Sequence, residues 1–253
     1  MLIGSEIADF RGWPQVEAIP RIPVRPGPTT VKAALRSVGV SCLVLFVHLL
    51  GWGGCGPASL RAEEAWSSLW AANSDEFFRR WQVTSYGGDG AVGFADGCLT
   101  MDAGVALTGV HWRGELPFPR VGYELRCQAR RTQGSDFFCG LTFPYGQGAA
   151  TYVLGGWGGS LVGLSCLDGH DASDNETTHF HQFKPNQWYD VRIRVREGFI
   201  DAWIDEARVM AVRVRDREVS VRGDVAASQP LGLTTFQSRG QVKDLAYRRL
   251  DRK

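Results

Sequence analysis

The sequence carries almost no net charge: 28 basic and 27 acidic residues give +1. A protein dedicated to binding nucleic acid needs a basic surplus, because it neutralises phosphates with lysine and arginine. The balance therefore argues against nucleic acid as a partner. It also provides no field that would steer an acidic ligand to the surface.

The sequence also lacks the short motifs that mark common catalytic sites. It contains no G-x-S-x-G, no P-loop, no H-E-x-x-H and no dinucleotide-binding fingerprint. No helical period is visible after residue 80. Paired glycosidase carboxylates are defined by their separation in the fold, so the sequence alone does not identify them.

What the sequence does contain is typical of an all-β protein. It has 253 residues, 31 glycines and nine tryptophans, which suits many short strands joined by glycine turns. Residues 121–131 alternate between apolar and polar side chains, the period of a half-buried strand. Residues 189–196 and 199–205 alternate in the same way on either side of a Glu197-Gly198 turn, which predicts a hairpin. Roughly a dozen such strands predict a two-sheet sandwich or a barrel.

The N-terminal part predicts export. Residues 38–50 form an apolar run preceded by Lys32 and Arg36 and followed by small residues, which is typical of a signal peptide. Cleavage after Ala62 would leave one domain over residues 63–253, and the proline-rich residues 1–30 are expected to be disordered. Two alternatives stay open: Cys55 as a lipidated cysteine, and the apolar run as an uncleaved anchor. All three place the domain outside the cytoplasm, periplasmic, at the cell surface or secreted, with membrane contact only through this segment.

Four cysteines lie in the predicted domain: Cys98, Cys127, Cys139 and Cys166. Outside the cytoplasm they would be in an oxidising compartment. Their spacing matches no zinc motif, and four cysteines allow three disulfide pairings. Cys127 and Cys139 fall on what looks like one hairpin, so they are expected to face each other unless all four are buried as free thiols.

Two stretches, residues 187–205 and 230–248, resemble the 3-keto-disaccharide hydrolase domain family. The first reads QWYDVRIRVREGFIDAWID, similar to the family's WNxYxIxxxGxxIxxWxNG, and the second ends in VKDLAYR, similar to its VxFRNIxIR. Gly122-Tyr123-Glu124-Leu125 is similar to its GDFEL strand. The resemblance covers roughly residues 77–250 and implies a concanavalin A-like two-sheet jelly roll, carbohydrate as the partner, and cleavage of glycosides oxidised at C3.

One departure from the family pattern bears on catalysis. The family's GLQxHG would place a histidine where this chain has Phe236, after Thr234 and Thr235. A phenylalanine neither transfers protons nor binds metal. The chain is therefore either catalytic through other groups or a non-catalytic carbohydrate-binding or cell-surface module.

Segment 154–183 combines the features expected of a ligand site. Trp157 lies among four glycines, which permit close approach of a ligand and would leave the ring as a flat platform for a sugar. The competing expectation is a core tryptophan. Tyr145 and Arg239, in glycine-containing loops, are secondary candidates for ligand binding.

An acidic loop follows, with Asp168, Asp171, Asp174 and Glu176 around His170. Carboxylate and amide oxygens suit calcium, although the spacing is not that of an EF-hand. The alternative is a solvated loop with an Asx turn. His179 and His181 come next and, if on a strand, share one face. They could hold a transition metal or act as acid and base, or simply lie at the surface opposite a buried Phe180.

These observations predict a site in which Trp157 stacks on a sugar and His170 contacts it. Asp168, His179 and His181 would supply catalytic or polar contacts, and a divalent metal would be the cofactor if there is one.

Overall fold

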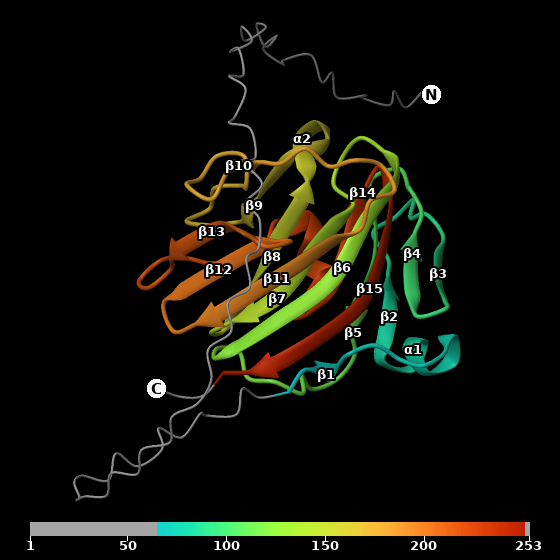
Figure 1. The fold of residues 1–253 in the computed structure, drawn as a ribbon, viewed down its shortest axis with the longest axis horizontal. Helices are drawn as coiled ribbons and strands as arrows, with labels where there is room; N and C mark the ends of the chain where they lie inside the picture. Colours follow the sequence, from blue (N-terminus) through green and yellow to red (C-terminus); the bar gives the residue numbers. More distant parts are fainter. Residues whose placement is uncertain (1–64, 251–253) are drawn as a thin grey trace, which may run out of the picture. The chain divides into compact units, whose positions relative to one another are not determined.

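The computed structural model describes residues 65–250, so the predicted apolar segment 38–50, Cys55 and the cleavage site after Ala62 lie outside the described residues. Residues 65–250 form two antiparallel sheets packed face to face (Figure 1). The predicted two-sheet sandwich is confirmed. Within residues 65–250 no helix is both long and apolar enough to span a bilayer.

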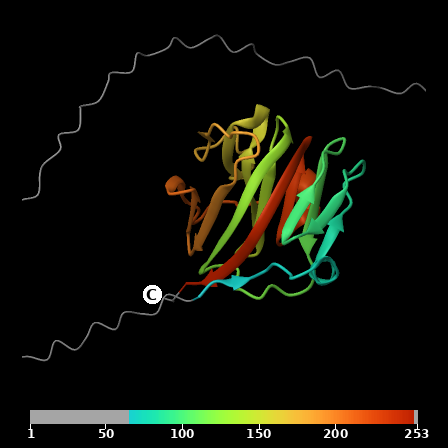
Figure 2. The same cartoon turned by 45° about the vertical axis from the view of Figure 1, so that its right-hand side comes forward.

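The first sheet has eight strands, with β6 and β15 crossing its middle (Figures 1 and 2). Seven of them follow one another across the sheet, and the eighth, β1, pairs only with β15. In spatial order the strands are β13 (Ala207–Arg213), β12 (Phe199–Ile204), β11 (Tyr189–Arg196), β6 (Tyr123–Gly134), β15 (Ser238–Arg249), β4 (Cys98–Met101) and β3 (Val92–Ala95), with β1 (Ser67–Ser68) beside β15.

The second sheet has seven strands and lies behind the first in the view of Figure 1. In spatial order they are β10 (His179–Phe180), β9 (Leu161–Ser165), β8 (Gly148–Gly155), β7 (Cys139–Tyr145), β14 (Gly232–Phe236), β5 (Leu107–Trp112) and β2 (Trp81–Thr84). Three short helical segments complete the described chain: α1 (Ser74–Arg80), α2 (Gly156–Gly159) and the 3₁₀ helix η1 (Gly223–Ser228).

The core fills the space between the sheets. The predicted hairpin is present, with β11 and β12 paired from Val191–Ile204 to Arg196–Phe199. Its inward positions Ile193 and Ala202 are fully buried. Alternation works here because successive side chains of a strand point to opposite faces of the sheet.

Two local predictions need correction. Cys127 and Cys139 do not belong to one hairpin, because β6 lies in the eight-stranded sheet and β7 in the seven-stranded sheet. Phe180 is not buried opposite the histidines: the residue is 70% exposed, on the two-residue edge strand β10.

Candidate functional site

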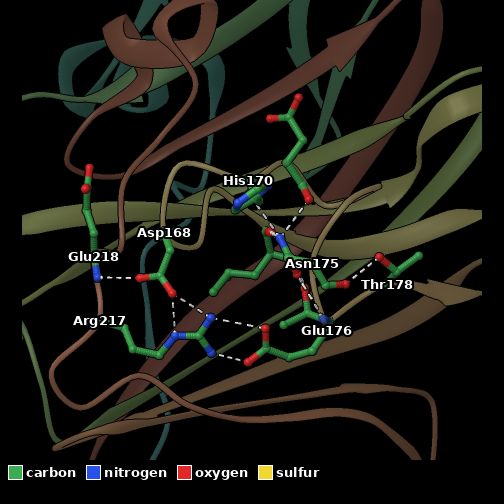
Figure 3. A network of polar contacts seen from close by, with 10 residues as sticks. Asp168, His170, Asn175, Glu176, Thr178, Arg217 and Glu218 are labelled. Carbon is green, nitrogen blue, oxygen red and sulfur yellow. Dashed lines mark hydrogen bonds and ion pairs between the residues drawn. The ribbon is translucent and has the colours of Figure 1, made fainter.

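Arg217, from a distant segment of the chain, binds the acidic loop (Figure 3). Arg217 donates from Nε to Asp168 Oδ2 at 2.8 Å and from Nη2 to Glu176 Oε2 at 3.1 Å. The backbone N–H of Glu218 donates to the other Asp168 oxygen at 3.0 Å. Because these hydrogen bonds from Arg217 favour the charged carboxylates, the pKa values of Asp168 and Glu176 are both lowered.

The other members of the loop also have partners of their own. Arg222 Nη1 lies 2.8 Å from Asp171 Oδ2, and His170 Nδ1 lies 3.1 Å from Asp174 Oδ2. The Asn175 amide closes the loop by donating to three backbone carbonyls, those of Leu164, His170 and Asp171. In residues 65–250 no three His, Cys, Asp or Glu side chains are placed to hold a metal ion.

The calcium-like arrangement expected from composition is therefore not what the structure has. The Arg217 guanidinium lies between Asp168 and Glu176, whereas Asp171 pairs with Arg222 and Asp174 with His170. The alternative of a solvated loop describes the geometry better. Arg217 and Arg222, which pair with the carboxylates of the loop, come from a segment outside it.

The two histidines differ in their surroundings. His179 is exposed on β10 and pairs with Val162. The His181 ring packs 4.5 Å from Phe183 and 5.5 Å from Tyr189, between ring centroids. Burial lowers the pKa of His181, and Asp205 and His179 act on it in opposite directions.

Trp157 is half-buried in the turn of α2 and has a left-handed backbone, φ 48°. Asp136 Oδ2 accepts from Gly158 N–H at 3.3 Å, and Arg131 Nη1 donates to Gly159 O at 3.2 Å. These two hydrogen bonds hold the turn in place. In the described part of the chain, no hydrogen bond, ion pair or ring contact joins Trp157 to the acidic loop or to either histidine.

Tyr145 and Arg239 have partners outside both the acidic loop and the α2 turn. The Tyr145 hydroxyl accepts from Gly198 N–H at 3.2 Å, beside the β11–β12 turn. Arg239 lies on β15 with its Nε 2.7 Å from Asp102 Oδ1, an ion pair by distance whose angle is not that of a hydrogen bond. The residues predicted to form one site therefore lie in separate contact networks.

The outer face of the eight-stranded sheet carries an array that the sequence analysis did not single out. Three half-buried tryptophans each have two cationic side chains over the ring, at distances typical of cation–π contacts. The pairs, with distances to ring centroids, are Trp66 with Arg126 (4.4 Å) and Arg248 (4.9 Å), Trp188 with Arg130 (4.4 Å) and Lys243 (4.7 Å), and Trp203 with Arg192 (4.0 Å) and Arg194 (5.0 Å).

A buried carboxylate organises these arginines. Glu124 occupies an outward position of β6 but is fully buried. Arg194 Nε donates to its Oε1, Arg248 Nε donates to its Oε2 at 2.5 Å, and Arg192 Nη1 lies 3.8 Å away. The arginines of β11 thus pair with an acid that is buried beneath them.

Beside this array lies a groove of about 780 Å³, the Trp66 groove. Trp66 lines it together with residues of β6 and β11. Its charged lining consists of three arginines, Arg126, Arg192 and Arg248, and four carboxylates, Asp190, Asp205, Glu206 and Asp244. A second groove, of about 830 Å³, lies on the same face and includes Trp188, Arg130 and Lys243.

The outer face of the seven-stranded sheet is closed at its centre. Thr142 and Thr234 are fully buried there, and Thr142 hydrogen-bonds to Thr151 at 2.9 Å. Ala172 and η1 approach this face so closely that a Cβ on Gly163 would lie 3.0 Å from the Ala172 Cβ, and one on Gly232 would lie 2.5 Å from Ser228 O.

Phe236, at the position of the family's histidine, stacks on Phe137 with ring centroids 5.8 Å apart. This position therefore holds an aromatic contact instead of a proton-transfer group.

No protein-family model matches the chain. No curated protein matches it. Among solved structures, a sialidase is similar with TM-score 0.50 and 7% identity, over 75% of this chain and 19% of that one. The Crh5 transglycosylase in complex with NAG gives 0.49 and 10% over 76% and 85%, and the carbohydrate-binding module CBM66 from Bacillus subtilis gives 0.45 and 9% over 66% and 94%.

At these identities the likeness is one of fold. The chain shares the two-sheet β-sandwich with the sialidase, of which it spans about a fifth. The resemblance to the 3-keto-disaccharide hydrolase domain finds no matching family model and stays a prediction.

Proposed function

We propose that this domain binds carbohydrate in the Trp66 groove on the outer face of the eight-stranded sheet. The observation that carries the proposal is the lining: an aromatic ring beside guanidinium and carboxylate groups from β6, β11, β15 and the turn after β12. A sugar presents apolar C–H faces that pack on an aromatic ring. Its hydroxyls both donate and accept, and charged partners make the stronger hydrogen bonds to them.

The charges of the groove favour a sugar without net charge. Three arginines face four carboxylates, so the lining has no excess of positive charge that would select a phosphate, sulfate or uronate. Several groups are already oriented: Gln128 Nε2 donates to Asp190 Oδ1 at 2.8 Å, and Asp205 Oδ1 accepts from Asp190 N–H at 2.9 Å. Pre-positioned groups lose less conformational entropy when a ligand binds.

The proposed setting is outside the cytoplasm, as the N-terminal apolar run predicts. Cell-envelope and extracellular glycans would then be the available ligands.

Cleavage of 3-keto-glycosides is the second candidate, supported by the resemblance of residues 187–205 and 230–248. These stretches form the β11–β12 hairpin and the β14–β15 region. Incubation of the purified full chain with 3-keto-trehalose, with and without divalent metal, tests it. Release of free sugar above a heat-inactivated control would support the enzyme. No release would contradict it, and carbohydrate binding would then be the sole proposed function.

The binding proposal is tested by screening the full chain against immobilised neutral and acidic oligosaccharides, then measuring the best ligand by calorimetry. Trp66→Ala removes the aromatic wall and should weaken binding about tenfold or more. Trp157→Ala is the matched control, because it removes a half-buried tryptophan in another part of the fold.

The two variants separate the two sites. Loss of binding in Trp157→Ala with normal binding in Trp66→Ala would move the site to α2, as the sequence analysis predicted. A chain that retains no glycan at all would contradict the proposal.

A further inference from the structure

Two cysteines from facing sheets meet in the core. Cys127 lies on β6 of the eight-stranded sheet and Cys139 is the first residue of β7 in the seven-stranded sheet. Both occupy inward positions, with exposed fractions of 3% and 0%. Their neighbours along the two strands, Leu125, Ala129 and Leu141, are core residues as well.

Both side chains point into the core between the two sheets. The neighbouring Cys139 thiol, together with burial, raises the pKa of Cys127 well above its usual range. The raised pKa keeps the Cys127 thiol protonated in the reduced, folded protein, which disfavours nucleophilic or metal-binding chemistry there because both need the thiolate. A pair of buried thiols from opposite layers is, however, correctly placed for a cross-link.

We propose that Cys127 and Cys139 form a disulfide that ties the two sheets together through the core. The oxidant is a small disulfide, RSSR, or a disulfide oxidoreductase. One cysteine thiolate attacks RSSR and releases RSH, and the second then attacks the mixed disulfide and releases another RSH. The protein loses two hydrogen atoms, and two electrons pass to the oxidant.

Burial sets when this happens. An oxidant does not reach two cysteines whose residues are 3% and 0% exposed, so the bond would form while the sheets are still closing and the thiols keep their ordinary pKa. Once the sandwich has closed, the same burial shields the bond from reductants.

The other described cysteines have different surroundings. Cys98 lies at an outward, half-buried position of β4 with its sulfur 3.7 Å from the carbonyl oxygen of Leu99. The Cys166 sulfur lies 3.3 Å from Asp171 Oδ1. Cys127 and Cys139 are thus the two described cysteines that we propose to pair, and Cys98 and Cys166 stay free thiols.

The test is a disulfide map of the refolded full chain. The chain is unfolded with reductant, refolded in a glutathione redox buffer, alkylated and digested with trypsin without reduction. Cys127 falls in the peptide 127–130, whereas Cys139 shares its peptide with Cys166, since no cleavable Lys or Arg lies between residues 132 and 183. The map is therefore made on Cys166→Ser, with wild type in parallel.

The expected product is a peptide 127–130 linked to the peptide that contains Cys139, and it should disappear on reduction. Oxidation should raise Tm by roughly 5–10 °C in wild type and in Cys98→Ser, but not in Cys127→Ser or Cys139→Ser. If Cys127 and Cys139 are both recovered alkylated after oxidative refolding, or either is linked to another cysteine, the proposal is wrong. This result does not depend on whether the domain binds sugar.

Discussion

Arg248 Nε donates a 2.5 Å hydrogen bond to Glu124 Oε2 across the β15–β6 pair. Arg194 reaches the other oxygen of the same carboxylate from β11, and Arg192 lies 3.8 Å from it. One buried negative charge thus holds three guanidinium groups from the strands on either side. These arginines in turn lie over Trp66 and Trp203, so the geometry of the Trp66 groove depends on Glu124.

Glu124→Gln should therefore destabilise the domain strongly. The amide keeps the shape but removes the negative charge that the three arginines share, and breaking a buried ion pair by removing one partner costs about 3–5 kcal/mol. Denaturant unfolding measures the change in free energy of unfolding. Glu197→Gln, an exposed residue of the β11–β12 turn, is the control and should shift it by less than about 0.5 kcal/mol. Equal effects of the two substitutions would contradict the role given to Glu124.

Arg126→Ala should weaken glycan binding more than it changes stability. Arg126 is exposed, lines the Trp66 groove and lies over the Trp66 ring. Its loss removes hydrogen-bond donors and the packing of one side chain, so affinity should fall about three- to tenfold with Tm nearly unchanged. Arg213→Ala removes an exposed arginine of β13 that does not line the groove. Calorimetry should show full affinity in this control, and a matching loss there would point to a general charge effect.

Much of the fold follows from patterns that are local in the sequence. The β11–β12 hairpin was predictable because Val191, Ile193 and Val195 alternate with arginines and a Glu-Gly pair makes the turn. The assignment of strands to sheets was not predictable in this way. β6 and β7 are consecutive and look like a hairpin, yet the chain crosses between layers at residues 135–138.

The site was much less predictable, because its contacts join residues far apart in the chain. The sequence around Asp168 does not indicate that Arg217 will pair with it, and the sequence around Glu124 does not indicate that Arg248 will pair with it. Trp203 could have been found, since it alternates with the buried Ala202 and Ile204 and so points outward. Trp66 and Trp188 lie outside strands, where alternation gives no information.

Calcium should have no effect on thermal stability. Arg217 already neutralises Asp168 and Glu176, and Arg222 pairs with Asp171, so an added cation would have to displace a guanidinium group. A ligand stabilises a fold only if it binds the native state. Tm measured in EDTA and in excess calcium chloride should agree within about 1 °C. A calcium-dependent rise that disappears in Asp168→Asn would restore the metal-binding loop predicted from composition.

The ion pairs of Arg217 with Asp168 and Glu176 should make the stability of the fold depend on pH in the acid range. Hydrogen bonds from Arg217 lower the pKa values of Asp168 and Glu176 in the folded state relative to the unfolded chain. Their contribution is therefore complete above the unfolded values of about 4 and is lost as pH falls through the lower folded values. Arg217→Gln should lower Tm slightly at pH 7, because the groups are exposed and screened by solvent, and the difference from wild type should shrink as pH falls below about 4. Arg213→Gln should show no such pH dependence. A wild-type advantage that persists unchanged at pH 3 would show that Arg217 acts through packing and not through the two carboxylates.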